Sequence, residues 1–190
     1  SAPLTSLLKS FIYLPEGVVI MIATMVHALY FFLPAYVANT CACLLGGGKP
    51  VDHGRIFMDG RRIFGDGVTI RGSLVGILSG VVAGVLMVYL ENLTNSPQGI
   101  EKILLAFLLS TGAIAGDAAG SFIKRRLNIA RGAPAPVLDQ LNFVVGGILF
   151  ASLVYTIKLE TVLVLLILTP IGHLMVNFTG YRLKLKDVPW

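Results

Sequence analysis

The chain has 190 residues, of which 55% are hydrophobic and 13% are charged. Its mean hydropathy of +0.82 lies far outside the range of soluble domains, so that class of protein is excluded. The net charge of +5 mostly reflects basic residues on one membrane face; its surplus also suits anionic lipid or a nucleotide, and composition does not separate these two ligands. We predict an all-α integral membrane protein that forms a single transmembrane domain over residues 1–190.

Five apolar stretches are each long enough to cross a bilayer, whose hydrocarbon core needs about 20 apolar residues in a helix. They cover about residues 17–45, 70–90, 102–120, 138–157 and 160–178. Two long, structured loops lie between them, at about 46–69 and 121–137, and basic residues gather in these loops and after the fifth stretch. The positive-inside rule then predicts a multi-pass protein of the cell membrane, with the N-terminus outside and both loops and the C-terminus in the cytoplasm.

The first loop, residues 46–69, is rich in glycine and in acidic and basic residues. Its glycines and Pro50 rule out a continuous helix, and its apolar residues argue against disorder; these are Ile56, Phe57, Met58, Ile63 and Phe64. Unstructured loops of this length are uncommon in compact domains, so we predict a turn-rich functional loop. Asn39 lies near the inner end of the first span, where it either packs helices or points into a site.

Asp117 and Asp139 lie at the two borders of the second loop, each at the end of a predicted span. Carboxylates in membrane helices are costly unless they face a cation, a metal or a cavity. A simpler interpretation also fits Asp139, because an acid stabilises a helix N-terminus. Asp117 is at a helix C-terminus, where the dipole disfavours an acid, and Lys124 follows on the same helix face. The pattern predicts a site for a divalent metal and a phosphate-rich ligand at the membrane surface.

Several linked motifs resemble those of the CDP-archaeol synthase family of archaeal membrane enzymes. They are GKPVDHG, DGRRIFGDGVTIRG, GDAAGSFIKRR and PAPVLDQLN, and the resemblance covers nearly the whole chain. The third and fourth spans are also similar to the CDP-diacylglycerol synthase signature, whose order of charged residues is matched by Asp117, Lys124, Arg125 and Asp139.

The chain departs from those patterns at three places. RGAPAP replaces the Pro-Gly-His-Gly-Gly element of the CDP-diacylglycerol synthase signature, and Asn142 stands where that signature has a second acid. Val68 stands where we expect a lysine before the threonine of the first loop, which weakens any phosphate-binding role for that position.

The resemblance implies Mg²⁺-dependent transfer of a cytidylyl group from CTP to the phosphate of an unsaturated archaeal diether lipid, which yields CDP-archaeol and pyrophosphate for phospholipid synthesis. Catalytic roles are assigned to Asp117, Asp139, Asp66 and Lys124, of which Asp117 and Asp139 hold the metal. The residues assigned to substrate binding are Arg125, Arg126, Arg61, Arg62, Arg71, Asn39, Asp59, Gly67, Thr69 and Asn142. The expected partners are CTP, the diether lipid phosphate and membrane lipid, with no nucleic acid and no protein partner.

Two other functions remain open at this point. A small cation transporter or channel would use Asp117 and Asp139 as an intramembrane path, although both acids lie at one interface and no inverted repeat is visible. A CDP-alcohol phosphotransferase is faintly indicated by Asp59–Gly60–Arg61. CTP separates the three, because a transporter is indifferent to it and a phosphotransferase consumes a CDP-lipid instead of making one.

Overall fold

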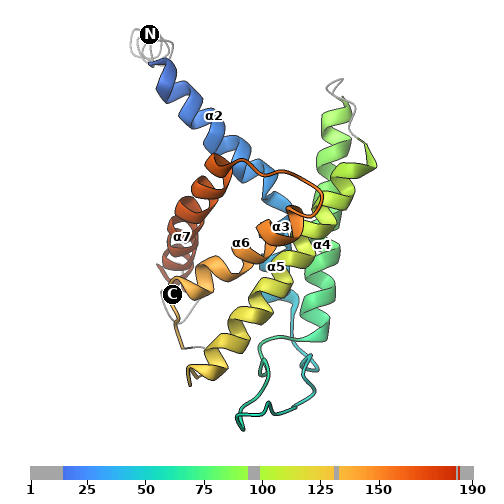
Figure 1. The fold of residues 1–190 in the computed structure, drawn as a ribbon, viewed down its shortest axis with the longest axis vertical. Coiled ribbons are helices and arrows are strands. Elements are labelled where there is room, and N and C mark those ends of the chain that lie inside the picture. Colours follow the sequence, from blue (N-terminus) through green and yellow to red (C-terminus); the bar gives the residue numbers. More distant parts are fainter. Residues whose placement is uncertain (1–14, 94–98, 131–132, 183, 185–190) are drawn as a thin grey trace.

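The computed structural model describes residues 15–93, 99–130, 133–182 and 184, and within these it contains helices and turns but no strand. The helices are α2 (Glu16–Phe31), α3 (Leu33–Leu45), α4 (Ile70–Leu93), α5 (Ile100–Arg126), α6 (Leu138–Ala151) and α7 (Leu159–Arg182) (Figure 1). The predicted all-α class is therefore confirmed. The predicted positions of the two chain ends fall largely on residues 1–14 and 185–190, which lie outside the described residues.

The first predicted span is a bent pair of helices. α2 and α3 meet at Phe32 with a bend of 49°. Pro34 causes this break, because proline lacks the N–H of a helix interior but fits the first turn of a new helix, and it lies in the first turn of α3. The chain therefore changes direction at Phe32, two residues before Pro34.

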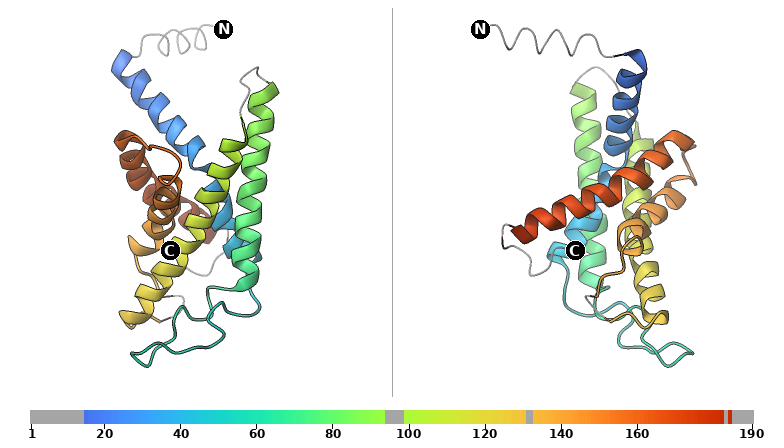
Figure 2. Two further views of the ribbon diagram at one scale, coloured as in Figure 1. Left: turned by 45° about the vertical axis from the view of Figure 1, so that its right-hand side comes forward. Right: turned by 90° about the vertical axis from the view of Figure 1, so that its left-hand side faces the viewer.

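Helices α4 and α5 form the long axis of the molecule (Figures 1 and 2). One face of α4 carries Gly72, Gly76, Gly80 and Gly84, all buried against α3 and α5. The opposite face exposes large apolar side chains, among them Leu74, Leu78 and Val82. Small residues allow close helix packing in lipid, and an exposed apolar face of this size suits hydrocarbon as its solvent. This distribution supports a membrane protein.

The fourth predicted span is wrong at its end, because α6 stops at Ala151 instead of reaching residue 157. Its 14 residues extend about 21 Å, less than the bilayer core of about 30 Å. Among the described residues, α4 and α5 are each long and apolar enough to span a membrane, and the bent pair α2–α3 is a third candidate. The five-span count thus stays a prediction.

The predicted start of the second loop, at residue 121, is also wrong. Helix α5 continues through Phe122 and Ile123 to Arg126. Basic side chains stabilise a helix C-terminus through its dipole, and Lys124, Arg125 and Arg126 occupy this last turn. These three cations are therefore held on a helix.

The two ends of the α4–α5 pair have different surroundings (Figure 2). We call the end with residues 46–69, the C-terminus of α5 and the start of α6 the loop end. The opposite end, with the end of α4 and the starts of α2 and α5, is the far end. Between them, a buried apolar cluster that includes Phe32, Leu109, Phe143, Val144 and Leu165 joins α2, α3, α5, α6 and α7.

Candidate active site at the loop end

Two polar contacts connect the last turns of α5 to the first turns of α6. Asn142 Nδ2 donates a hydrogen bond of 3.2 Å to Asp117 Oδ1. Lys124 Nζ forms an ion pair of 2.6 Å with Asp139 Oδ1. Asp117 and Lys124 therefore share one face of α5, as predicted, and this face meets Asn142 and Asp139 of α6.

Glycines on α5 make this contact possible. A Cβ atom at Gly120 would lie 3.0 Å from Cγ of Asn142, and one at Gly116 would collide with the Asn142 backbone. Any larger residue at either position would push the helices apart and separate Asn142 from Asp117. The glycine stripe thus has a functional consequence as well as a packing role.

The two acids differ in how fully their oxygens are bonded. Asp139 Oδ1 pairs with Lys124, and its Oδ2 accepts a hydrogen bond of 2.9 Å from the backbone N–H of Ala135. It lies in the first turn of α6, so the helix-dipole interpretation also applies to it. Asp117 accepts only the bond from Asn142, and within the described residues no cation pairs with it directly. Asp117 is therefore the acid with spare acceptor capacity.

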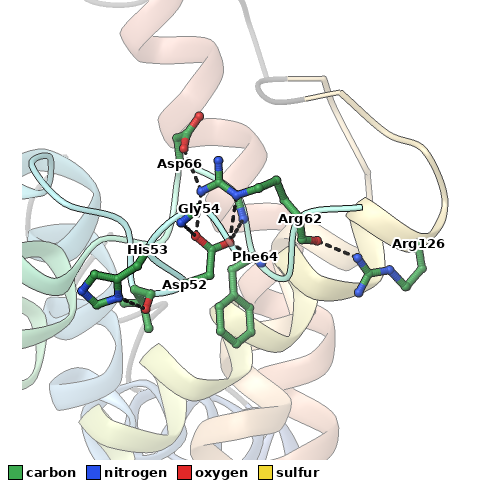
Figure 3. A network of polar contacts seen from close by, with 9 residues as sticks. Asp52, His53, Gly54, Arg62, Phe64, Asp66 and Arg126 are labelled. Carbon is green, nitrogen blue, oxygen red and sulfur yellow. Dashed lines mark hydrogen bonds and ion pairs between the residues drawn. The ribbon is translucent and has the colours of Figure 1, made fainter. Parts of the chain in front are cut away.

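Asp52 organises the first loop, a role that the sequence analysis missed (Figure 3). Its side chain is fully buried and pairs with Arg62 Nη2 at 2.6 Å. It also accepts hydrogen bonds from the backbone N–H groups of Gly54 at 3.0 Å, Phe64 at 3.0 Å and Gly65 at 2.9 Å. Burial raises the pKa of Asp52, but Arg62 and the three backbone donors outweigh it and hold that pKa well below its usual range.

A signal for Asp52 was present in the sequence. An aspartate two residues before a glycine is typical of a turn in which the side chain accepts the backbone N–H, as Asp52 does from Gly54. The other donors come from residues 62–65, and no local pattern indicates them.

Arg126 attaches the loop to α5. Its guanidinium lies 4.4 Å from the ring centre of Phe122 and 5.0 Å from that of Phe57. It also pairs with Asp59 at 2.6 Å and donates to the carbonyl oxygen of Arg62 at 2.6 Å. We predicted Arg126 and Asp59 as substrate-binding residues; in the structure they pair with each other at this junction between the loop and α5.

Arg61 contributes to the same junction. Its Nη1 donates to the carbonyl oxygens of Arg125 and Arg126 at the end of α5. This is a favourable place for a cation, since the carbonyl groups at a helix C-terminus lack intrahelical partners.

Arg125 and Asp66 are less constrained. The Arg125 side chain passes beside Gly65, where its Cδ would lie 3.6 Å from an added Cβ, and its buried Nε has no hydrogen-bond acceptor within the described residues. Asp66 pairs with Arg62 at 2.9 Å while 57% of its side chain stays exposed. Nη1 of Arg126 is likewise buried without an acceptor in the described residues. Guanidinium nitrogens without an acceptor and an exposed acid are groups that can meet a ligand.

The remaining predicted residues have varied surroundings. Thr69 is buried at the start of α4, where its Oγ1 accepts the N–H groups of Gly72 at 3.1 Å and Gly47 at 3.2 Å. Val68 is buried beside it, which is why an apolar residue suits this position. Gly67 and Arg71 are exposed, and Asn39 is half-buried on α3. In the part of the chain that the structure describes, neither Asn39 nor Arg71 makes a side-chain hydrogen bond.

The donor set allows a limited test of metal binding. Across the described residues, no three histidine, cysteine or acidic side chains gather into a metal-binding group. Mg²⁺ in nucleotide enzymes usually takes one or two carboxylates together with phosphate oxygens and water. Asp117, which keeps acceptor capacity, fits that pattern, whereas Asp139 would share its oxygens with Lys124 and the Ala135 N–H.

Comparisons with known proteins agree on one family. The family model described as CarS-like, CDP-archaeol synthase, matches residues 21–190. The CDP-archaeol synthase of Methanocaldococcus jannaschii is 50% identical over 169 residues, covering 86% of this chain and 96% of the relative. That of Methanopyrus kandleri is 54% identical over 164 residues, covering 85% and 91%.

A solved structure is similar as well. It was reported as structural insight into an intramembrane enzyme for archaeal membrane lipids biosynthesis. It matches with a TM-score of 0.73 at 39% identity, covering 80% of this chain and 94% of that chain.

Proposed function

Because the chain belongs to the CDP-archaeol synthase family, which confirms the resemblance seen in its motifs, we propose that it transfers the cytidylyl group of CTP to an unsaturated archaeal diether lipid phosphate. An oxygen of the lipid phosphate forms a bond to the α-phosphorus of CTP. The bond from that phosphorus to the oxygen bridging the α- and β-phosphates breaks, and pyrophosphate leaves.

This reaction needs charge neutralisation more than it needs a strong base. A phosphate monoester already carries about −1.5 to −2 charges at neutral pH, so the nucleophile is ready, but it must approach another anion. Electrostatic stabilisation and positioning dominate phosphoryl-type transfers of this kind. The candidate site should therefore offer excess positive charge around a few acids.

The charge distribution at the loop end is the observation that carries the proposal. Cations outnumber acids there: Lys49, Arg55, Arg61, Arg62, Arg71, Lys124, Arg125 and Arg126 against Asp52, Asp59, Asp66, Asp117 and Asp139. Asp139 of α6 pairs with Lys124 of α5. Lys124 follows Asp117 on the same face of α5. Arg125 presents a buried guanidinium nitrogen without an acceptor in the described chain. We assign Lys124 and Arg125 to the phosphates of the two substrates.

Asp117 and Asp139 would hold the Mg²⁺ ion, with Asn142 orienting Asp117. Such an ion, when bound, draws phosphate oxygens together and offsets the charge of the leaving pyrophosphate. Asp66, exposed and held only by Arg62, is the next acid within the loop that can approach the triphosphate. Arg61, Arg126 and Asp59 support the reaction by fixing the loop to α5.

The excess of cations also bears on the membrane sidedness. Loops that carry an excess of lysine and arginine face the cytoplasm, so we infer that the loop end is cytoplasmic, where CTP is available. The transporter alternative lacks support, because the family and the relatives named above are lipid-synthesis enzymes.

Release of pyrophosphate by the purified protein in detergent tests the proposal. The mixture contains Mg²⁺, CTP and an unsaturated diether glycerol phosphate, and each substrate is omitted in turn. We expect release only when both are present, and little release when ATP or GTP replaces CTP. A folded protein that releases no pyrophosphate from the complete mixture would contradict the proposal, as would release that does not need the lipid.

A further inference from the structure

Asp52 makes more polar contacts than a loop residue needs for solubility. Its side chain is fully buried, yet it accepts bonds from three backbone N–H groups and from both Nε and Nη2 of Arg62, at 3.3 and 2.6 Å. A buried carboxylate is costly unless all of its acceptor sites are used. Asp52 meets that requirement because donors from residue 54 and from within residues 62–65 all bond to its carboxylate.

The groups gathered by Asp52 are the ones that support candidate substrate-binding residues. Arg62, paired with Asp52, pairs through the same Nη2 with Asp66 at 2.9 Å. The Arg62 carbonyl oxygen accepts a hydrogen bond from Arg126. Gly65, whose N–H donates to Asp52, adopts a positive φ of 86° and lies against the side chain of Arg125. The Asp52 carboxylate therefore positions Asp66 through Arg62, and it also positions the Gly65 backbone that the Arg125 side chain contacts.

Outside the Asp52 contacts, Arg61 and Arg126 attach the loop to α5, and backbone hydrogen bonds in turns hold the rest. The loop's regular pairing is limited to two isolated bridges, Pro50 with Thr69 and Ile56 with Arg62. The helices, in contrast, pack through their own glycine faces and apolar cluster. A change at Asp52 should therefore alter the loop while the helix bundle stays folded.

We propose that Asp52 is a positioning residue for the reaction, which acts through Arg62 and Gly65 to hold Asp66 and Arg125 in place for the triphosphate of CTP. This inference rests on the proposed function. Asp52 itself does not touch the substrate, since its side chain is fully buried. We expect its influence to fall on the nucleotide, because Asp66 belongs to the loop and the Arg125 side chain lies against it, whereas the exposed apolar helix faces are the surfaces that suit lipid chains.

The test compares Asp52→Asn and Arg62→Lys with Glu91→Gln. Asp52→Asn keeps the size of the side chain but removes its charge, and Arg62→Lys keeps the charge but removes the planar fork that reaches both Asp52 and Asp66. Glu91→Gln is the matched control, because Glu91 also pairs with a cation, Lys102, at 2.7 Å, but at the far end. Pyrophosphate release gives kcat and the KM of each substrate, and thermal unfolding reports the stability of the bundle.

For both loop variants we expect kcat/KM for CTP to fall about tenfold or more, as is typical when a charged hydrogen-bonded group loses its partner. The KM of the lipid should change less than about twofold, and Glu91→Gln should leave the KM of CTP unchanged. Loop variants with wild-type kinetics would overturn the inference, and so would equal losses for CTP and lipid that follow a fall in Tm. A wild-type protein without pyrophosphate release would instead contradict the proposed function itself.

Discussion

The two ends of the α4–α5 pair each hold acids paired with cations, but the pairs are arranged differently. At the far end, Glu91 accepts from Tyr30 at 2.9 Å and pairs with Lys102 at 2.7 Å, so that both of its oxygens are used and α2, α4 and α5 are tied together. At the loop end, the contacts are shared among a loop and two helices, and Asp117, Asp66 and Arg125 keep bonding capacity. The comparison separates ion pairs that hold a bundle together from those that support a ligand site.

The far end also shows that a cavity alone does not locate the chemistry. A cavity of about 560 Å³ lies there, lined by Tyr30, Glu91 and Lys102 and by apolar residues such as Phe31 and Leu109. Glu91 and Lys102 already bond to each other there, and with Glu101 in the lining as well the cations are not in excess. Among the residues that the structure describes, charge excess and unused donors point to the loop end.

The largest expected effect comes from removing the two acids at the contact between α5 and α6. Asp117→Asn and Asp139→Asn should each lower pyrophosphate release by about 100-fold or more, as expected when one electrostatic group of a charge-stabilising site is removed. Glu91→Gln should keep activity within about threefold, because the pair that it breaks lies away from the reaction. Near-wild-type turnover in Asp117→Asn would show that this acid at the loop end matters no more to the reaction than Glu91 at the far end.

Two glycine substitutions test whether close helix packing affects the reaction at each end of the α4–α5 pair. A methyl group at Gly120 would meet Asn142, and one at Gly84 would meet Ala106. Both Gly120→Ala and Gly84→Ala should lower the free energy of unfolding by about 1–3 kcal/mol through overpacking.

Only Gly120→Ala should also lower kcat, by about 100-fold, because it displaces Asn142 and Asp117 from each other. Thermal unfolding and steady-state rates of the two variants provide the check. Equal effects of the two substitutions on kcat would show that the α5–α6 spacing does not matter to the reaction.

A smaller effect is expected from breaking the far-end ion pair. Glu91→Gln should lower the free energy of unfolding by about 0.5–1.5 kcal/mol, the net contribution of a typical hydrogen bond, because the Lys102 side chain is 41% exposed. The cluster joins three helices, so the loss should appear as a lower Tm in detergent with unchanged substrate KM values. If Tm stayed at the wild-type value, the far-end contacts would contribute nothing measurable to stability.

The smallest effect concerns pH. The pKa of Asp52 is lower in the folded loop than its value of about 3.9 in an unfolded chain, so the unfolded state binds more protons between these values. The stabilisation is fully present above about pH 4 and is lost as the pH falls through the folded pKa. The protection of the Phe64 and Gly65 amides, measured relative to the intrinsic exchange rate at each pH, should fall in acid below about pH 4 in the wild-type protein. Asp52→Asn should show low protection of these amides at every pH, and an equal acid dependence of protection in both proteins would contradict this account.

The sequence was sufficient for the features that depend on hydropathy and local periodicity. Apolar stretches predicted the helices, apart from the break at Phe32 and the early end of α6. Helical spacing put Asp117 and Lys124 on one face, which the structure brings against Asn142 and Asp139. Glycine content correctly indicated that residues 46–69 are not a helix.

The remaining features depend on contacts between segments that are distant in sequence. The early end of α6 at Ala151 could not be predicted, because the residues that follow are as apolar as those before it. The stacking of Arg126 on Phe57 and Phe122 requires the loop to fold back on α5. The role of Asp52 was missed for the same reason, since Arg62, Phe64 and Gly65 reach it only after the loop has closed.

The most direct test of the central claim follows the phosphorus atoms of CTP. Purified protein in detergent is given Mg²⁺, the unsaturated diether glycerol phosphate and CTP labelled at either the α- or the γ-phosphate, and the lipid extract is counted for the wild type, Asp117→Asn and Glu91→Gln. The account predicts that label from the α-phosphate enters the lipid in wild type and Glu91→Gln but not in Asp117→Asn, and that γ-label never does. Label entering the lipid from the γ-phosphate, or equal α-labelling in wild type and Asp117→Asn, would contradict cytidylyl transfer at the loop end.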